Sequence, residues 1–146
     1  MNYKALDIAE YVISKCNEGN IPITNLKLQK ILYYIQAYSL VLLDDKMFRE
    51  EIRAWTYGPV VKEVYDEYSH YAAFPINRTT EFQLSDKREI DVVRRVFLDK
   101  ISIDAWDLVE QTHNEDPWKE TIEMFGEGAI IPCELIKDYF EDRVKR

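Results

Sequence analysis

Apolar residues recur at helical spacing along most of this chain. Between positions 5 and 16 they fall three and four residues apart, as on one face of a helix, and a polar run through Gly19-Asn20 follows as a stop signal. A longer pattern begins at Thr24 or Asn25, either of which can serve as N-cap. It is apolar around much of its circumference, so it predicts a central helix that other elements cover on more than one side. Its apolar residues include Leu28, Ile31, Leu32, Tyr34, Ile35, Tyr38, Val41 and Leu42.

The periodicity changes after this second helix. Polar and apolar residues roughly alternate from Met47 to Trp55, which predicts short extended segments, such as a small hairpin or a paired edge. We expect Gly58-Pro59 to open a third helix, because a proline at the first helical position loses no hydrogen bond. Positions 70–85 are irregular and predict a surface loop, with a short strand near positions 81–84.

Helical spacing returns in the C-terminal half, and no internal repeat or low-complexity linker interrupts residues 1–146. The sequence therefore predicts a mainly α fold. We expect a single compact domain of about six helices, with a minor short β element around residues 47–55. The expected start signals of the later helices are Ser85, Ser102 or Asp104, Asp116-Pro117 and Pro132.

Composition and charge narrow the possible partners. The chain has 146 residues, of which 47% are hydrophobic, and this is enough for one core. Its net charge is −8, and its basic residues alternate with acids. We expect no nucleic-acid ligand, because phosphate contacts need clustered cations. An acidic surface suits solubility and attraction to a basic partner.

The sequence also argues against a membrane location. The longest apolar stretch, positions 31–43, is broken by Gln36 and is shorter than the ~20 residues that span a bilayer. The first residues lack the basic-then-apolar pattern of a signal peptide. Two cysteines, Cys16 and Cys133, are too few for a disulfide framework. We therefore expect a soluble, cytoplasmic protein.

Candidate chemistry is sparse. His113, Glu115 and Asp116 form a conceivable metal-ligand group, but a helix end at His113 and a cap at Asp116 explain them better. Cys133 begins a helix, where a thiol pKa can fall, yet it would need His113 or His70 as its base. We expect no catalytic residue, no metal and no cofactor. A Cys/His hydrolase that uses His113 with Cys133 or Glu115 is the alternative from another class.

Three segments are too specific for generic helix or loop: 26–34 (LKLQKILYY), 54–61 (AWTYGPVV, followed by Val64-Tyr65) and 112–118 (THNEDPW). In this order and at these separations they resemble the Panacea-domain family of antitoxins. The first segment matches its pattern around K-L-Q-K, the second around A-W-x-Y-G-P-V, and the third around T-H-x-x-x-P-W. The resemblance covers nearly the whole chain.

This resemblance implies a function in a bacterial or prophage toxin–antitoxin system. Proteins of this kind neutralise a cognate toxin protein that is encoded beside them. A SocA-like branch resembles proteolytic adaptors that deliver a toxin to a ClpXP-type protease, and other members are phage-associated, GepA-like proteins. We therefore expect an antitoxin that acts by direct protein–protein binding, with the adaptor as the alternative. The identity of the toxin and the oligomeric state stay open.

The motif residues are the candidates for partner binding. Trp55 and Tyr57 fall on the same side of an extended segment, and large aromatic residues with a polar edge are favoured binding anchors. They are also ordinary core residues, so both interpretations stay open. Two lysines on one flank of the central helix are further candidates, whether as partner contacts or as solvated charges. The full candidate set is Trp55, Tyr57, Gly58, Pro59, Lys27, Lys30, His113 and Trp118.

Overall fold

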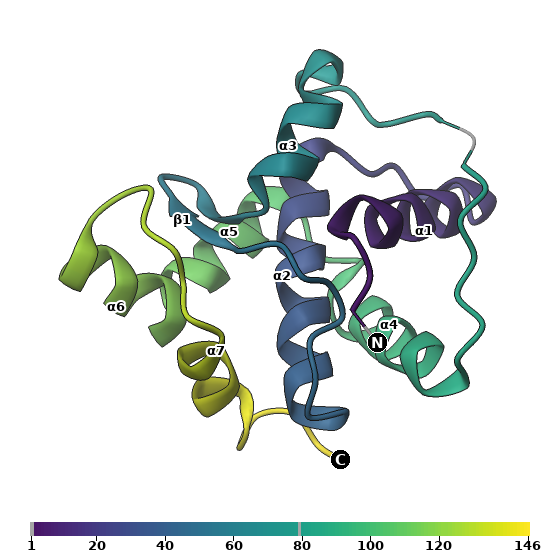
Figure 1. The fold of residues 1–146 in the computed structure, drawn as a ribbon. Coiled ribbons are helices and arrows are strands. Elements are labelled where there is room, and N and C mark those ends of the chain that lie inside the picture. Colours follow the sequence, from purple (N-terminus) through teal and green to yellow (C-terminus); the bar gives the residue numbers. More distant parts are fainter. Residues whose placement is uncertain (1, 79) are drawn as a thin grey trace.

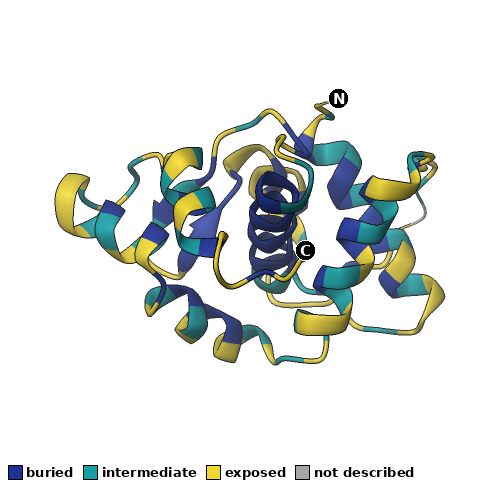
Figure 2. Cartoon of the chain, turned by 90° about the horizontal axis from the view of Figure 1, so that it is seen from below, coloured by how far each residue is buried: buried dark blue, intermediate teal, exposed yellow. Residues whose placement is uncertain are grey.

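The central helix α2 (Asn25–Leu42) runs through the middle of the molecule, and the other elements surround it (Figures 1 and 2). The computed structural model describes residues 2–78 and 80–146. Within these ranges the chain forms seven α-helices, one 3₁₀-helix and a two-stranded antiparallel sheet. This confirms the prediction of a compact, mainly α domain with a minor β element. The other elements are α1 (Ala5–Glu18), β1 (Arg53–Trp55), β2 (Gly58–Val60), α3 (Lys62–Tyr68), η1 (Ser69–Tyr71), α4 (Lys87–Lys100), α5 (Ala105–His113), α6 (Asp116–Phe125) and α7 (Cys133–Phe140).

The core of the protein is built around α2. Thr24 is its N-cap, and the Thr24 side chain accepts a hydrogen bond from the Lys27 N–H at 3.3 Å. Fifteen of the 18 residues of α2 are buried, because α1, α4, α5 and α7 all pack against it. Figure 2 shows α2 almost end-on, with buried residues around its whole circumference. This wide burial is what the apolar pattern predicts.

Polar side chains are buried on α2 too, and they bind backbone groups of neighbouring segments. Gln36 is the clearest case. Its Oε1 accepts the N–H groups of Met47 and Phe48 at 2.8 and 3.2 Å, and its Nε2 donates to the Phe48 carbonyl at 2.8 Å. A buried backbone group without a partner costs about 1–3 kcal/mol, so these contacts fix the path of the loop after α2. Ser39 does the same by donating to the Asp45 carbonyl at 2.7 Å.

The β element lies slightly later than expected and includes a residue that we expected in a helix. β1 and β2 pair antiparallel, with Arg53 opposite Val60 and Trp55 opposite Gly58. The expectation that Pro59 opens the third helix is wrong, because Pro59 lies inside β2 and α3 begins at Lys62. Gly58 has φ +105°, and this conformation lets the chain turn back into β2 instead of entering a helix.

Other boundary predictions were partly right. Asp104 does cap α5, with its side chain accepting from the Trp106 N–H. The cap of α4 is Asp86, one residue after the expected Ser85. The expected strand near positions 81–84 does not form; these residues are coil. Among the described residues, no helix has both the length and the apolar character needed to cross a membrane.

Candidate functional site: a braced aromatic hairpin

Polar side chains of α2 hydrogen-bond the backbone of the hairpin formed by β1 and β2 and of the residues that follow it. We call these contacts the first brace. The Oε1 of Gln29 accepts the Val61 N–H at 2.9 Å, and its Nε2 donates to Asn25 Oδ1 at the same distance. Asn25 in turn donates to the Tyr65 carbonyl at 3.0 Å. Lys30 Nζ donates to the Pro59 carbonyl at 3.1 Å. Residues of the K-L-Q-K segment therefore fix the end of the hairpin and the start of α3.

The THNEDPW segment, at the junction of α5 and α6, makes a second set of hydrogen bonds to the hairpin, which we call the second brace. Trp118 Nε1 donates to the Trp55 carbonyl at 2.8 Å. His113 Nε2 lies 3.0 Å from the Thr56 carbonyl, and since a carbonyl oxygen only accepts, Nε2 is the donor. The two rings stack on each other with centroids 4.1 Å apart. All three sequence motifs thus meet at one hairpin, although residues 35–111 separate the first from the last.

Gly58 is required at the hairpin turn for two reasons. Its φ of +105° is a backbone conformation that residues with a side chain rarely adopt. A Cβ at this position would also come within 2.7 Å of Lys30 Cε and 2.7 Å of Thr112 Oγ1. The Y-G-P motif is therefore explained by close packing between the hairpin, α2 and α5.

Neither Lys27 nor Lys30, the two lysines of α2, is fully exposed to solvent. Lys30 has no exposed surface, so the expectation of an exposed flank is wrong for this residue. Burial lowers the pKa of Lys30 to about 7. Lys27 is partly buried and hydrogen-bonds the Ile101 carbonyl through its Nζ. Lys30 supports the hairpin from the interior, and Lys27 ties α2 to the end of α4.

The THNEDPW segment also contains a buried carboxylate, that of Glu115. Glu115 is the N-cap residue of α6, so the expectation that Asp116 caps this helix is wrong: Asp116 is its first residue. The Glu115 carboxylate accepts hydrogen bonds from Tyr33 at 3.0 Å and from Tyr34 at 2.9 Å. Burial raises the pKa of Glu115 to about 7, against the two tyrosine hydrogen bonds, which lower it.

The outer side of the hairpin carries an aromatic surface, which we define as Trp55, Tyr57, Tyr65 and Trp106. Trp55 packs edge-on against Tyr65 with ring centroids 5.1 Å apart, and Tyr57 packs edge-on against Trp106 at 5.2 Å. Tyr57 and Trp106 are 55% and 56% exposed.

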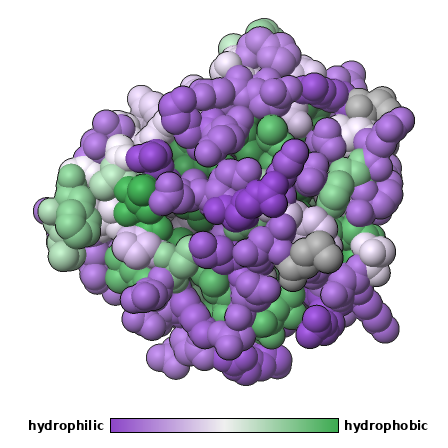
Figure 3. Space-filling model, in the orientation of Figure 1, coloured by the Kyte–Doolittle hydropathy of each residue, from purple (hydrophilic) through white to green (hydrophobic). Residues whose placement is uncertain are grey.

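These four rings border a cavity of about 460 Å³. Its remaining lining comes from α2, from the hairpin, from η1 and the residues after it, and from one acidic residue: Asn25, Leu26, Gln29, Lys30, Thr56, Val60, Ser69, Ala72, Ala73 and Glu127. Most of the face seen in Figure 3 is hydrophilic, with apolar residues confined to patches. A cluster of four aromatic rings beside a cavity suits the binding of another molecule.

The structure separates the predicted site residues into two groups. Trp55 and Tyr57 belong to the aromatic surface, with Trp55 partly buried and Tyr57 exposed. The other predicted residues are not part of this surface. Gly58 and Pro59 belong to β2 of the hairpin itself, and Lys30, His113 and Trp118 contact the hairpin backbone. Lys27 contacts the end of α4 instead.

Two members of the aromatic surface were missed from the sequence. Trp106 follows the Asp104 cap and lies off the apolar register of α5, and an aromatic residue on a polar helix face is a signal that could have found it. Tyr65 directly follows the second motif but is absent from the candidate set, and the structure shows it exposed.

The residues of the hydrolase alternative are engaged in other contacts. His113 contacts Thr56 and Trp118, while Glu115 binds the two tyrosines. Burial raises the pKa of the Cys133 thiol, which disfavours the reactive thiolate. Across residues 2–78 and 80–146, no group of three or more His, Cys, Asp or Glu residues is placed to hold a metal ion.

The fold and the site define a small helical domain in which three motifs brace one aromatic hairpin at the surface. The chain belongs to the family described as "Antitoxin SocA-like, Panacea domain", whose profile matches residues 28–119. It is 29% identical over 150 residues to Antitoxin SocA of Caulobacter vibrioides (strain NA1000 / CB15N), across 91% of this chain and 80% of that protein. No solved structure matches.

The resemblance drawn from the three motifs is therefore confirmed. The match begins at Leu28, inside the first motif, and ends at Lys119, directly after the last. Membership of this family supports an antitoxin role and favours a non-enzymatic protein. It also implies a cognate toxin as partner.

Proposed function

We propose that this chain neutralises a cognate toxin protein by binding it directly, and that the aromatic surface is the contact area. The observation that carries the proposal is the exposure of two contacting rings, Tyr57 on a hairpin that three motifs hold in place and Trp106 on the adjacent α5. Two large aromatic rings that are exposed to water contribute little to the stability of the chain itself, since the burial of apolar surface is what stabilises a fold.

The bracing contacts support a recognition role for the hairpin. Hydrogen bonds with Gln29, Lys30, His113 and Trp118 fix its backbone, together with that of Val61 directly after it, on both sides. Holding a contact segment in its bound conformation reduces the entropy lost on association. Aromatic residues at the centre of an interface commonly carry most of the binding energy. The rigid hairpin and its rings therefore have the properties of a preorganised protein-binding site.

Charge supports a basic toxin surface as the partner. The chain carries a net charge of −8, and Glu127 lies at the cavity beside the rings. Complementary potentials speed the encounter of two proteins and select against wrong partners. The buried amine of Lys30 does not oppose this, because its lowered pKa of about 7 removes much of its charge at neutral pH.

The proposal is tested by growth rescue in cells that express the toxin. We expect Tyr57→Ala and Trp106→Ala to reduce rescue strongly while the melting temperature stays within a few degrees of wild type, because both side chains are exposed. Tyr57→Phe and Trp106→Phe retain a ring and should keep most of the rescue. Met124→Ala is the matched control, since Met124 is exposed on α6 and does not line the cavity. Full rescue by both alanine variants would place the contact area elsewhere.

A further inference from the structure

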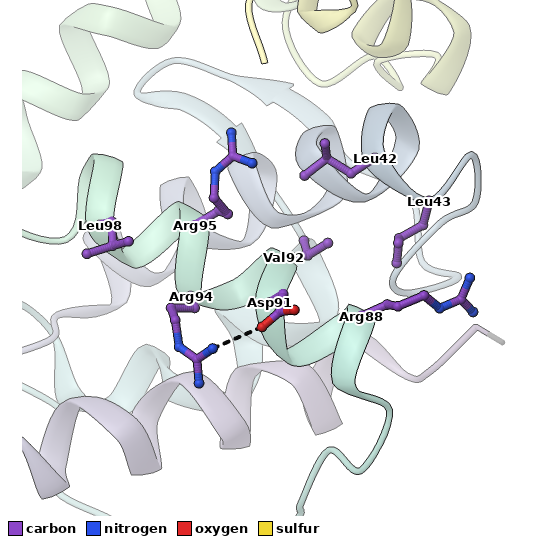
Figure 4. A pocket seen from close by; sticks show the side chains of 8 residues that line it. All are labelled: Leu42, Leu43, Arg88, Asp91, Val92, Arg94, Arg95 and Leu98. Carbon is purple, nitrogen blue, oxygen red and sulfur yellow. Dashed lines mark hydrogen bonds and ion pairs between the residues drawn. The ribbon is translucent and has the colours of Figure 1, made fainter. Parts of the chain in front are cut away.

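A second groove lies at the other end of the central helix, between the C-terminal end of α2 and α4. Figure 4 shows the side chains that border it, and its volume is about 480 Å³. We call it the Leu–Arg groove, because four apolar and four charged residues line it: Leu42, Leu43, Val92, Leu98, Arg88, Asp91, Arg94 and Arg95.

The apolar part of the groove is open to solvent. Leu98 is 75% exposed, which is unusual for a leucine on a helix that packs against the core. Leu42 and Leu43 are partly exposed on the facing side, and Val92 forms a buried floor between α4 and α2. An apolar side chain from another molecule would therefore find contacts on both walls.

The charged part of the groove is basic on a protein that is acidic as a whole. Three arginines oppose a single aspartate in the lining, whereas the chain carries a net charge of −8. Arg94 pairs with Asp91 at 2.9 Å within one turn of α4, and Arg88 lies 3.6 Å from Asp86. The side chains of both arginines are mostly exposed. Exposed pairs of this kind contribute little to stability, so the guanidinium groups can turn to another carboxylate.

The third arginine is already fixed at the edge of the groove. Arg95 donates to the Lys145 carbonyl at 2.9 Å, and Arg146 donates to the Val41 carbonyl at 2.7 Å. Both contacts place cationic residues of the C-terminal segment beside the groove. Arg146 also pairs with Glu141, so the positive charge that the groove offers is that of the arginines on α4.

The Leu–Arg groove is separate from the aromatic surface. Leu26 lines the cavity beside the rings, and Leu42 lines the groove. At 1.5 Å per residue along α2, the two positions lie about 24 Å apart. One ligand segment of a few residues cannot fill both sites.

We propose that the Leu–Arg groove binds an acidic peptide segment that carries leucine-like side chains. Carboxylates of the segment pair with Arg88 and Arg94, since a guanidinium binds a carboxylate through two parallel hydrogen bonds. Apolar side chains between these carboxylates rest against the leucines of α2 and α4. A nucleic acid fits less well, because its backbone would leave the four apolar residues unused and three arginines give few phosphate contacts.

The test is an NMR titration of the full chain with a short synthetic peptide in which leucines alternate with glutamates. We expect saturable shifts of the methyl groups of Leu42, Leu43 and Leu98. The double variant Arg88→Glu with Arg94→Glu should weaken binding by about tenfold or more, because two complementary pairs become repulsive. Arg49→Glu is the matched control, since Arg49 is exposed outside the groove, and it should bind like wild type.

Four results would overturn the proposal. The first is the absence of shifts at the groove. The second is a peptide with lysines in place of the glutamates that binds as tightly as the acidic peptide, and the third is a single-stranded oligonucleotide that binds more tightly than it. The fourth is a dimer of the wild-type chain that the charge-reversed variant does not form. The last result would assign the groove to self-association. Tyr57→Ala should bind the acidic peptide normally, so a failure here is distinguishable from a failure of the proposed toxin contact.

Discussion

At the scale of single residues, Gly58 links the three motifs. Its backbone turns the chain into β2, and its missing side chain leaves the space that Lys30 and Thr112 occupy. Gly58→Ala would impose an unfavourable φ and a contact of 2.7 Å with each neighbour. We expect it to lower the free energy of unfolding by about 2–4 kcal/mol. Urea denaturation measures this change.

Gly126 supplies the control for that substitution. It also has a positive φ, +88°, but no atom lies within 4 Å of where its Cβ would be. Gly126→Ala should therefore cost only the backbone strain, about 1–3 kcal/mol, and less than Gly58→Ala. If both substitutions lowered the free energy of unfolding equally, the close packing at Gly58 would make no contribution to stability.

The shifted pKa values of Glu115 and Lys30 predict that the free energy of unfolding changes with pH in opposite directions over two pH ranges. Between pH 4.5 and about 7 the folded chain keeps the Glu115 proton that the unfolded chain releases, so the free energy of unfolding falls as pH rises. Between about pH 7 and 10.5 the unfolded chain holds the Lys30 proton that the folded chain lacks, so stability rises with pH. The contribution is on the order of 3 kcal/mol for Glu115 and about 5 kcal/mol for Lys30.

Isosteric variants separate the two slopes. Glu115→Gln should remove the fall on the acid side, and Lys30→Met should remove the rise on the alkaline side. The measurement is the free energy of unfolding from urea titrations at pH 5, 7 and 9, each compared with wild type. Unchanged slopes in both variants would show that these groups titrate normally in the folded chain.

At the scale of elements, the hairpin depends on distant polar side chains more than on its own strands. Each strand has three residues, and an isolated hairpin of this size is marginal in water. Gln29→Ala leaves the buried Val61 N–H without a partner. We expect a loss of about 1–3 kcal/mol and faster hydrogen exchange at the Val61 amide.

A glutamine at the surface is the matched control. Gln83→Ala removes an exposed amide and should change stability by less than about 0.5 kcal/mol. If the Val61 amide exchanged at the same rate in the Gln29 variant as in wild type, the bracing from α2 would not be what holds the hairpin.

The helices could be predicted because their signals are local. The width of the apolar pattern predicted the central position of α2, and the caps at Thr24 and Asp104 were within the expected choices. The path of the chain at Pro59 could not be predicted in this way. The segment Gly58-Pro59 is compatible with a helix start. The strand is selected by hydrogen bonds of its backbone and of the Val61 N–H with Lys30 and Gln29, about 30 positions away in sequence.

The candidate site was only half predictable for the same reason. Trp55 and Tyr57 were found because they belong to a motif, whereas Trp106 lies outside every motif and reaches the site only through the packing of α5 beside β2. Lys30 was placed on an exposed flank because lysines are rarely fully buried. Its burial follows from the hairpin that covers it.

At the scale of the whole molecule, α2 supports two different surfaces at its two ends. The aromatic surface lies over the N-terminal end of α2, and the Leu–Arg groove lies at its C-terminal end. Fifteen buried residues make this helix a rigid support. Substitutions at one surface should therefore leave the other unchanged, since distant sites without shared contacts act additively.

The central claim is that the toxin binds the aromatic surface, and calorimetric titration of the purified chain with its purified toxin tests it most directly. We predict saturable binding by the wild type and by the variant with Arg88→Glu and Arg94→Glu. The variant with Tyr57→Ala and Trp106→Ala should bind at least about 100-fold more weakly, as expected for two central anchors. Wild-type affinity in this aromatic variant, with a normal melting temperature, would contradict the claim. Tight binding that leaves the purified toxin active would instead favour the adaptor alternative, in which a protease removes the toxin.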